Sequence, residues 1–391
     1  MTRLPDAPWT KRDDLAQLIG AMGADNARYV GGAVRDSILG KDISDIDIAT
    51  PLLPAEVIDR CKAAGIRTVP TGIDHGTVTA ILPDGPVEIT TLRQDVSTDG
   101  RRATVAFAEE WREDAARRDF TINALYAHPE TFAISDYFGG IDDLRAGRVR
   151  FIGDAHQRIR EDHLRILRYF RFQARFGDDW DADALSACTE LASTLKGLSR
   201  ERVGWELQLL LGLPDPSPTI TKMRDIGVLE QILPESGKRQ IEMLSNLVAW
   251  ERAQDVAPDA LRRLGALLPP VAAIAESVSA RLRLSRQQRE RLRCIAGRRP
   301  DDGADPRALA YRQGNDCARD RLLLGGFALD AIAGWDAPEL PLKGGEIVAR
   351  GVERGPDVAR ILQAVENRWV EEGFPDRQRV EAILNSLLEN R

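Results

Sequence analysis

The stretch Tyr29-Val-Gly-Gly-Ala-Val-Arg-Asp36, followed closely by Ile43-Ser-Asp-Ile-Asp-Ile-Ala-Thr50, decides the fold of the N-terminal part of this chain. The first stretch has the pattern of a strand, a tight glycine turn and the start of a helix. Gly31 and Gly32 allow the backbone to approach a ligand closely, and the free N–H groups of a helix N-terminus suit a phosphate. The guanidinium of Arg35 is a further group that can bind phosphate oxygens. A phosphate-binding turn between a strand and a helix is therefore predicted here.

The second stretch alternates aspartate with isoleucine. Because successive side chains of a strand point to opposite faces, Asp45 and Asp47 are predicted on one face and Ile46 and Ile48 on the other. Two neighbouring carboxylates supply the hard oxygen ligands that Mg²⁺ prefers. A lone Asp-x-Asp is more often part of an ordinary solvated surface, and the chain has another at 181–183. The order of glycine turn and aspartate pair, at this short distance, favours a metal-assisted phosphate site.

Composition and charge restrict the class of protein. The 391 residues are 43% hydrophobic and 29% charged, a balance that excludes a mostly disordered chain, and the length predicts two or three domains. The net charge of −7 means that a nucleic-acid partner needs a local basic surface. Two segments are candidates: residues 145–175 hold nine arginines against three acidic residues, and residues 281–299 hold eight arginines against Glu290. The second segment is equally typical of a solvated helix face.

The cysteines and the absence of long apolar runs bear on the compartment. Cys61, Cys188, Cys294 and Cys317 are widely separated, without a Cys-x-x-Cys spacing, which predicts free thiols in a reducing cytoplasm. No apolar run reaches the roughly 18 residues of a membrane span, and the first residues lack the apolar core of a signal peptide. We therefore expect a cytoplasmic protein that does not enter a membrane.

The two halves of the chain differ in their periodicity. Residues 28–152 contain short β-rich runs with helix-like segments between them, such as 54–64. From Asp154 onward the apolar residues recur with a helical period. The predicted fold class is α+β, with a small mixed sheet in an N-terminal head followed by an all-helical remainder.

Four further motifs follow the aspartate pair in order: Arg117-Arg-Asp-Phe-Thr-Ile-Asn123, Asp136-Tyr-Phe-Gly-Gly-Ile-Asp-Asp-Leu144, Glu161-Asp-His-Leu-Arg165 and Arg200-Glu-Arg-Val-Gly-Trp-Glu206. Together with the first two stretches they resemble the class II polymerase-β-like nucleotidyltransferases, which comprise CCA-adding tRNA nucleotidyltransferases and bacterial poly(A) polymerases. The resemblance is dense over roughly 28–210. It implies a catalytic head at 1–144, a helical neck that recognises the base at 145–212, and a helical body and tail that bind tRNA at 213–391.

Residue types in these motifs suit the parts of a nucleotide. Arg118 can contact phosphate, and Asp119 and Asn123, four residues apart on a predicted helix face, can hydrogen-bond a ribose hydroxyl. Asp162 and Arg165 are predicted as neighbours on one helix face. Their acceptor and donor match the amino group and ring nitrogen that cytosine and adenine share, whereas guanine and uracil would be rejected. Taken alone, this pair is better explained as an intrahelical salt bridge.

The resemblance implies one role for each of these residues. Mg²⁺ would be held by Asp45 and Asp47. Glu88 lies at a family position that often supplies a third acidic side chain, although a plain surface carboxylate fits its strand equally well. The nucleotide would be bound by Gly31, Gly32, Arg35, Arg118, Asp119, Asn123, Asp162, Arg165, Arg168 and Arg171. The polar segment 93–113 corresponds to a loop that helps to position nucleotides, or else to a plain hairpin.

Within the family, Thr71-Gly-Ile-Asp-His-Gly-Thr-Val-Thr79 resembles CCA-adding enzymes rather than poly(A) polymerases. We therefore expect an Mg²⁺-dependent enzyme that adds or repairs the 3′-terminal CCA of tRNA from CTP and ATP, with release of pyrophosphate. A poly(A) polymerase, or a CC-only or A-only enzyme of the same family, remains an alternative. An alternative of another class is a catalytically silent RNA-binding protein.

Overall fold

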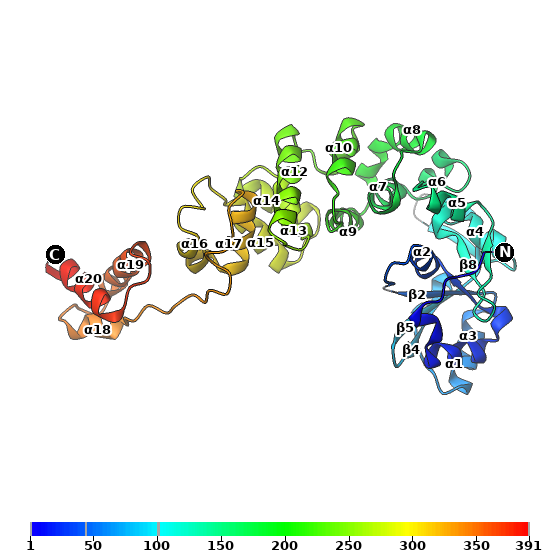
Figure 1. Ribbon diagram of the computed structural model, residues 1–391, viewed down its shortest axis with the longest axis horizontal. Coiled ribbons are helices and arrows are strands. Elements are labelled where there is room, and N and C mark those ends of the chain that lie inside the picture. Colours follow the sequence, from blue (N-terminus) through cyan, green and yellow to red (C-terminus); the bar gives the residue numbers. More distant parts are fainter. Residues whose placement is uncertain (1, 44, 100–101, 390–391) are drawn as a thin grey trace. The chain divides into compact units, whose positions relative to one another are not determined.

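The computed structural model describes residues 2–43, 45–99 and 102–389. The chain divides into two units, one formed by Met1–Leu210 with Pro218–Ile232 and the other by Leu211–Ser217 with Leu233–Arg391. Figure 1 shows strands only in the N-terminal half of the chain and helices throughout the C-terminal half. The predicted α+β class, with a mixed sheet followed by a helical remainder, is confirmed.

A seven-stranded mixed sheet organises the first unit, in the order β3-β4-β5-β2-β1-β8-β9. Only the β2–β5 pair is parallel among the pairings of this sheet. Its strands are β1 (Arg28–Val30), β2 (Ile46–Thr50), β3 (Arg67–Gly72), β4 (Thr77–Leu82), β5 (Gly85–Thr91), β8 (Leu125–Ala127) and β9 (Ile134–Asp136). A separate two-stranded hairpin, β6 (Arg93–Asp99) with β7 (Arg102–Phe107), follows β5. The predicted polar segment 93–113 thus begins as a hairpin.

The alternation of isoleucine and aspartate explains which side chains of the central strand β2 are buried. Ile46 and Ile48 are buried, while Asp47 between them is only partly covered and points to the other face. Asp45 lies just before the strand rather than within it. The isoleucines therefore bind β2 to the core, and the carboxylate between them is presented to the opposite face.

Helices surround the sheet and continue beyond it in the first unit. The predicted helix at 54–64 is observed as α3, which begins at Pro54. The helices of this unit are α1 (Asp13–Met22), α2 (Gly32–Ile38), α3 (Pro54–Ala63), α4 (Trp111–Ala116), α5 (Gly140–Arg145), α6 (Ala155–Glu161), α7 (Arg165–Phe176), α8 (Ala182–Glu190), α9 (Arg200–Leu211), α10 (Ser217–Asp225) and α11 (Val228–Ile232). Short 3₁₀ turns lie at Pro8–Lys11, Ala24–Asn26, Ile73–His75, Thr121–Asn123 and Ala192–Gly197.

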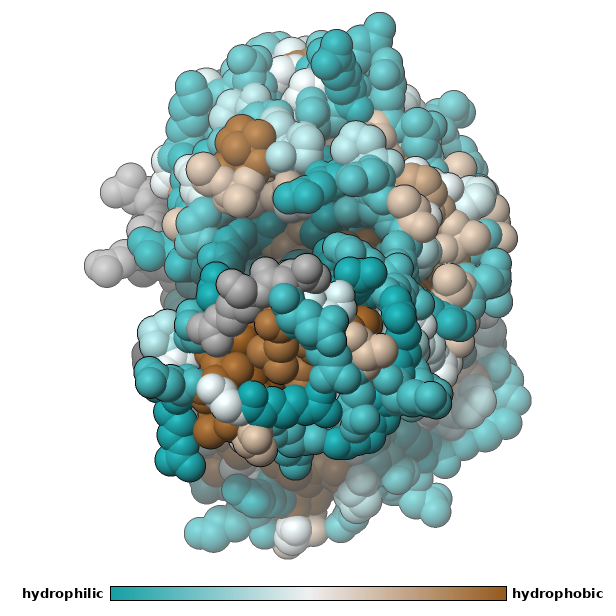
Figure 2. Space-filling model, turned by 90° about the vertical axis from the view of Figure 1, so that its left-hand side faces the viewer, coloured by the Kyte–Doolittle hydropathy of each residue, from teal (hydrophilic) through white to brown (hydrophobic). Residues whose placement is uncertain are grey.

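Helices are the regular secondary structure of the described residues of the second unit. Its helices are α12 (Lys238–Ala253), α13 (Ala260–Ala266), α14 (Ala272–Arg281), α15 (Arg286–Ala296), α16 (Pro306–Gln313), α17 (Asn315–Leu324), α18 (Gly344–Ala349), α19 (Pro356–Glu371) and α20 (Arg377–Glu389). Trp369, Val365, Ile347 and Leu384 belong to a buried core shared by α18, α19 and α20. Figure 2 looks onto the side where these three helices lie, which is mostly hydrophilic and has hydrophobic residues gathered in a patch. No helix in the described ranges combines the length and hydropathy of a membrane span.

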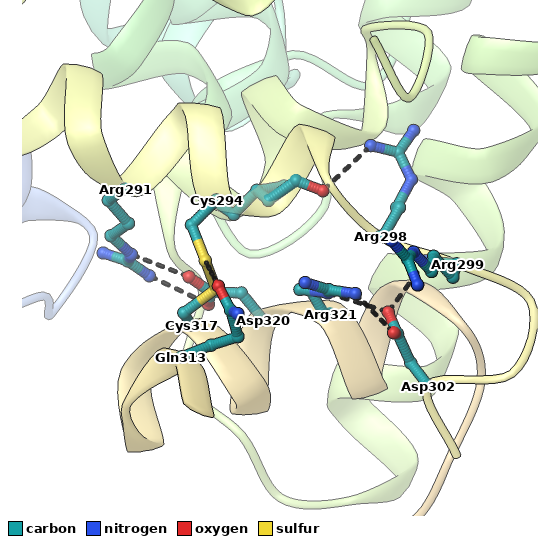
Figure 3. Close-up of a disulfide and its surroundings, with 10 residues drawn as sticks. Arg291, Cys294, Arg298, Arg299, Asp302, Gln313, Cys317, Asp320 and Arg321 are labelled. Atoms are coloured by element: carbon teal, nitrogen blue, oxygen red, sulfur yellow. Dashed lines mark hydrogen bonds and ion pairs between the residues drawn. A yellow bond between two sulfur atoms is a disulfide. The ribbon is translucent and has the colours of Figure 1, made fainter. Parts of the chain in front are cut away.

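The prediction of four free thiols is wrong for two of the cysteines. Cys294 on α15 and Cys317 on α17 form a disulfide with their Cα atoms 6.1 Å apart, while Cys61 and Cys188 are free and buried. Figure 3 shows this bond beside the ion pair of Arg291 with Asp320, which joins the same two helices. A sequence separation of 23 residues does not reveal that α15 and α17 pack together. Only two of the four cysteines therefore agree with the expectation of free thiols in a reducing compartment.

This disulfide is expected to stabilise the second unit. By the loop-entropy estimate, a cross-link closing a loop of this length contributes about 3 kcal/mol to the free energy of unfolding. The double variant Cys294→Ser/Cys317→Ser should therefore unfold at lower urea concentration than the oxidised wild type. Reductant should shift the wild type toward the double variant and leave the variant itself unchanged. Equal unfolding midpoints for all four samples would contradict the stabilising role.

Candidate active site

A cavity of about 380 Å³ in the first unit brings together the sequence motifs. Its wall is contributed by β1, β2 and β5, by the start of β6, by the segment after α4, by α7 and the turn before it, and by α9. Arginines outnumber acidic residues on this wall, so the cavity suits an anion such as a nucleoside triphosphate. Its charged lining residues are Asp47, Glu88, Arg93, Arg117, Arg118, Asp119, Asp162, Arg165, Arg168 and Arg202.

Two carboxylates lie side by side on the wall of the cavity that the sheet forms. Asp47 of β2 is the register partner of Glu88 of the parallel strand β5, so both side chains point to one face. Burial and then the charge of Glu88 raise the pKa of Asp47 to about 6, while Arg118 opposes this shift and Asp45 adds to it. The negative charge of Asp47 is therefore incompletely balanced by the protein. A cation at this place would stabilise the ionised form.

The donor set fits a divalent metal ion of the Mg²⁺ type. Asp45, Asp47 and Glu88 offer only carboxylate oxygens, which are the ligands such an ion prefers. Across residues 2–43, 45–99 and 102–389, no three His, Cys, Asp or Glu side chains form a ready metal-binding group by themselves. Mg²⁺ is commonly held by one or two carboxylates, with waters and substrate phosphates completing its shell. The residues present are thus sufficient for a site that substrate completes.

The glycine turn lies where it was predicted, but it does not line the cavity. Gly31 has a φ of 68°, a left-handed conformation that favours glycine, and it begins the turn into α2. A Cβ atom at Gly31 would lie 3.6 Å from Nη1 of Arg118, so the turn packs beside a guanidinium of the cavity wall. Gly32 is the first residue of α2. The turn therefore lies next to the cavity at Arg118 without contributing to its wall.

Arg35 does not reach the cavity, contrary to our expectation. Its side chain is buried and donates hydrogen bonds to Oδ1 of Asp36 at 2.8 Å and to Oδ1 of Asn123 at 2.5 Å. The carboxylate of Asp36 also pairs with Arg175 of α7 at 3.0 Å. In this conformation Arg35 joins α2 to the neighbouring elements of the head and is not available to a phosphate.

The arginines after α4 are held by a buried carboxylate that the sequence analysis missed. Asp114 accepts hydrogen bonds from the hydroxyl of Tyr126 at 2.6 Å, from Arg117 Nε at 2.9 Å and from Arg118 Nη2 at 3.2 Å. It also accepts the backbone N–H of Arg93, where the β6–β7 hairpin begins. Burial alone would raise the pKa of Asp114, but the charges of Arg118 and Arg117 lower it to about 2. Its position three and four residues before two arginines is the signal that could have identified it.

Replacement of Asp114 by asparagine should weaken nucleotide binding. Asparagine keeps one acceptor oxygen but turns an NH₂ group toward some of the four donors that Asp114 accepts, so Arg117 and Arg118 lose their fixed positions on the cavity wall. We expect the KM for CTP to rise about tenfold, which corresponds to about 1.4 kcal/mol, in the range of one hydrogen bond to a charged group. Steady-state kinetics with CTP measure this. Glu113→Gln is the matched control because Glu113 is exposed on the same helix. An unchanged KM for CTP in Asp114→Asn would refute the positioning role.

Asp119 and Asn123 touch each other, although no helix carries them. Asn123 belongs to the 3₁₀ turn Thr121–Asn123, and Asp119 precedes that turn, so the predicted shared helix face is wrong. Nδ2 of Asn123 nevertheless donates to Oδ1 of Asp119 at 3.0 Å. Asp119 lines the cavity, whereas Asn123 does not. The amide therefore supports the carboxylate, and the carboxylate is the group that faces a ligand.

Arg168 and Arg171 of α7 hold different positions. Arg168 lines the cavity, donates to Asp119 at 2.7 Å and lies 3.7 Å from Glu206 of α9. Arg171 donates to the same buried glutamate at 2.7 Å but does not line the cavity. Burial opposes ionisation of Asp119, but the charge of Arg168 together with hydrogen bonds from Asn123, Arg168 and the N–H of Phe120 lowers the pKa of that carboxyl. Glu206 thus holds both arginines toward the head.

The structure brings Asp162 and Arg165 to one wall but not onto one helix. Because α6 ends at Glu161 and α7 begins at Arg165, Asp162 lies in the turn between them, and the predicted helix face is wrong. Asp162 pairs with Arg202 of α9 at 2.7 Å, and Arg165 pairs with Glu161 at 2.7 Å. Both still line the cavity. Each of the two residues has its own positioning partner, which sequence spacing did not indicate.

Comparison with known proteins decides the family. Residues 27–150 match the model of the Poly A polymerase head domain, and residues 181–238 match the probable RNA and SrmB- binding site of polymerase A. The chain is 34% identical over 372 residues to the mitochondrial CCA tRNA nucleotidyltransferase 1 of Danio rerio, covering 88% of this chain and 83% of that protein. This chain belongs to the CCA tRNA nucleotidyltransferase family. It is therefore an enzyme of the nucleotidyltransferase class.

Bacterial relatives and solved structures agree with this assignment. The CCA-adding enzyme of Streptococcus gordonii is 41% identical over 224 residues, covering 56% of this chain and 55% of that protein. The crystal structure of the Bacillus stearothermophilus CCA-adding enzyme in complex with CTP aligns with a TM-score of 0.78 at 24% identity, covering 99% of both chains. The Thermotoga maritima CCA-adding enzyme complexed with tRNA_CCA aligns with a TM-score of 0.72 at 22% identity, covering 99% of this chain and 100% of that one. At these identities, the structural matches establish the shared fold.

Proposed function

We propose that this enzyme adds or repairs the 3′-terminal CCA of tRNA, using CTP and ATP and releasing pyrophosphate, without a nucleic-acid template. The observation that carries the proposal is the single cavity in which the carboxylates of Asp47 and Glu88 share a wall with arginines and with Asp162 and Arg165. Membership of the CCA tRNA nucleotidyltransferase family supports this choice over a poly(A) polymerase.

Asp45 and Asp47 would hold Mg²⁺, with Glu88 beside them as a third carboxylate. When bound, the ion would neutralise developing negative charge and lower the pKa of an attacking hydroxyl. Arg118 would bind phosphate oxygens of the nucleotide, since its guanidinium lies on the cavity wall and is fixed by Asp114. The 3′-hydroxyl of the RNA would then attack the α-phosphorus, and pyrophosphate would leave. Catalysis of this kind depends on positioning and charge neutralisation, with no covalent enzyme intermediate.

The remaining wall would hold the sugar and the base. Asp119 would accept a hydrogen bond from a ribose hydroxyl, as its carboxylate faces the cavity. Asp162 would accept from the amino group of cytosine or adenine, and Arg165 would donate to the ring nitrogen. The ion pairs of Asp162 and Arg165 leave hydrogen-bonding positions free for a base. A carboxylate has about four acceptor positions and a guanidinium has five donors, so neither side chain is saturated by its partners within the protein.

Sequencing of reaction products tests the proposed function directly. A tRNA that ends before its CCA is incubated with CTP and ATP, and the added nucleotides are read. The proposal predicts CCA with both nucleotides and CC when ATP is omitted. A run of adenylates would indicate a poly(A) polymerase, and products restricted to C or to A would indicate a partner enzyme of the same family. No incorporation would support an RNA-binding protein without catalysis.

A further inference from the structure

Helix α9 presents an exposed stripe that the site described above does not use. Trp205 is 65% exposed and Leu209, one turn further along, is 37% exposed. The opposite face of the helix is buried through Val203 and Leu207. An indole held this far in water forgoes the favourable free energy of burial. Large exposed aromatic side chains of this kind are typical of binding surfaces.

The guanidinium of Arg202 connects the exposed face of α9 with the active cavity. Arg202 precedes Trp205 by three residues, so the two side chains lie on the same face of α9. Arg202 pairs with Asp162 at 2.7 Å and lines the active cavity. It also lines a second cavity of about 330 Å³, whose other charged or polar lining side chains are His163, Ser193, Thr194 and Ser199. The active cavity, the second cavity and the exposed indole therefore adjoin one another around Arg202.

The chemistry of this surface matches a single-stranded nucleic acid. An exposed indole offers a flat face on which any base can stack, and Arg202 offers positive charge to a phosphate. The second cavity adds hydroxyl groups and His163, whose Nδ1 is buried without a hydrogen-bond partner among the described residues. These are groups that hydrogen-bond sugar hydroxyls. An apolar protein partner fits less well, because the charged residues Glu201 and Arg202 lie one helical turn before Trp205 on the same side of α9.

We propose that Trp205 is a stacking platform for a base of the single-stranded 3′ end of the RNA substrate, with the second cavity receiving a neighbouring nucleotide. The inference rests on the proposed function for the identity of the acceptor as RNA. The 3′ end must lie beside the cavity that contains Asp162 and Arg165 before its hydroxyl can react. The stacking surface itself contains none of the residues assigned to the metal ion. Trp205 is a binding residue in this account and takes no part in the chemical step.

Kinetics with separate variation of the two substrates test this assignment. Trp205→Ala should raise the KM for a tRNA lacking CCA by about five- to 150-fold, the range expected for loss of one base–aromatic stack. The KM for CTP should stay within about twofold, and Trp205→Phe should recover most of the RNA affinity. Leu53→Ala, another exposed apolar position of the first unit, is the control. An unchanged KM for RNA in Trp205→Ala, or equal losses in the Ala and Phe variants, would overturn the platform.

A binding measurement separates failure of this inference from failure of the proposed function. The tryptophan emission of the wild type and of Trp205→Phe is compared during titration with a short single-stranded RNA that has the sequence of a tRNA 3′ end. Quenching that disappears in Trp205→Phe supports stacking, even if the wild type transfers no nucleotide. Quenching of the same size in both proteins overturns the inference, even if the wild type adds CCA.

Discussion

Asp45→Ala is expected to reduce nucleotide transfer by at least about a thousandfold. Loss of one carboxylate would remove a ligand of the proposed metal ion, whose electrostatic contribution to the transition state is worth several kcal/mol. Asp47 and Glu88 would remain, but the ion would be held by one carboxylate fewer and no longer in the position that the reaction needs. The loss should therefore fall on kcat rather than on the KM for RNA.

The fold should tolerate this substitution. Asp45 is exposed and precedes β2, so it contributes no side chain to the core of the sheet. Thermal melting should shift little, and tRNA binding measured by gel shift should persist. Asp84→Ala, at an exposed carboxylate of the same unit, is the matched control and should retain activity. Normal incorporation of CTP by Asp45→Ala would show that this residue is not a metal ligand.

Arg165→Ala is expected to relax the choice of nucleotide. The guanidinium is the proposed donor to the ring nitrogen of cytosine and adenine, a contact that guanine and uracil cannot accept at the same position. A paired hydrogen-bond contact of this kind discriminates by about 1–3 kcal/mol, so incorporation of UTP relative to CTP should increase about ten- to hundredfold. The metal ligands are untouched, and the variant should still catalyse transfer.

Competition between CTP and UTP on the same tRNA measures this change. Arg165 also bonds Glu161 and the backbone oxygens of Arg158 and Arg117, so some loss of stability accompanies the substitution. Melting of each variant therefore accompanies the kinetics. Arg160→Ala, at an exposed position of α6, is the control for loss of positive charge. An unchanged CTP to UTP ratio in Arg165→Ala would refute the base-reading role.

Local patterns were the part of the fold that could be predicted. The alternation of Asp45, Ile46, Asp47 and Ile48 depends only on the period of a strand, and the turn at Gly31 depends only on a conformation that favours glycine. The turn lies where it was expected, and the alternation is observed from Ile46 onward, with Asp45 just before the strand. The helical periods beyond 154 were equally readable, because each period is a property of a short segment.

Contacts between segments far apart in the sequence could not be predicted from the local patterns. Arg35 was assigned to phosphate because it follows the glycine turn, but in the structure it faces Asn123, which lies 88 residues away. The helix across Asp162 and Arg165 is interrupted, since Asp162 accepts the N–H of Leu164 and pairs with Arg202 of a later helix. Neither the charge nor the spacing within one motif reveals these partners.

The most direct test of the account is binding of Mn²⁺, as a spectroscopic substitute for Mg²⁺, in the presence of a non-hydrolysable CTP analogue. Electron paramagnetic resonance measures free and bound Mn²⁺ for the wild type, Asp45→Ala and Asp47→Asn. The account predicts a bound ion in the wild type and at least about tenfold weaker binding in each variant. Equal Mn²⁺ affinity in all three proteins would contradict the claim that these two aspartates hold the metal ion beside the nucleotide.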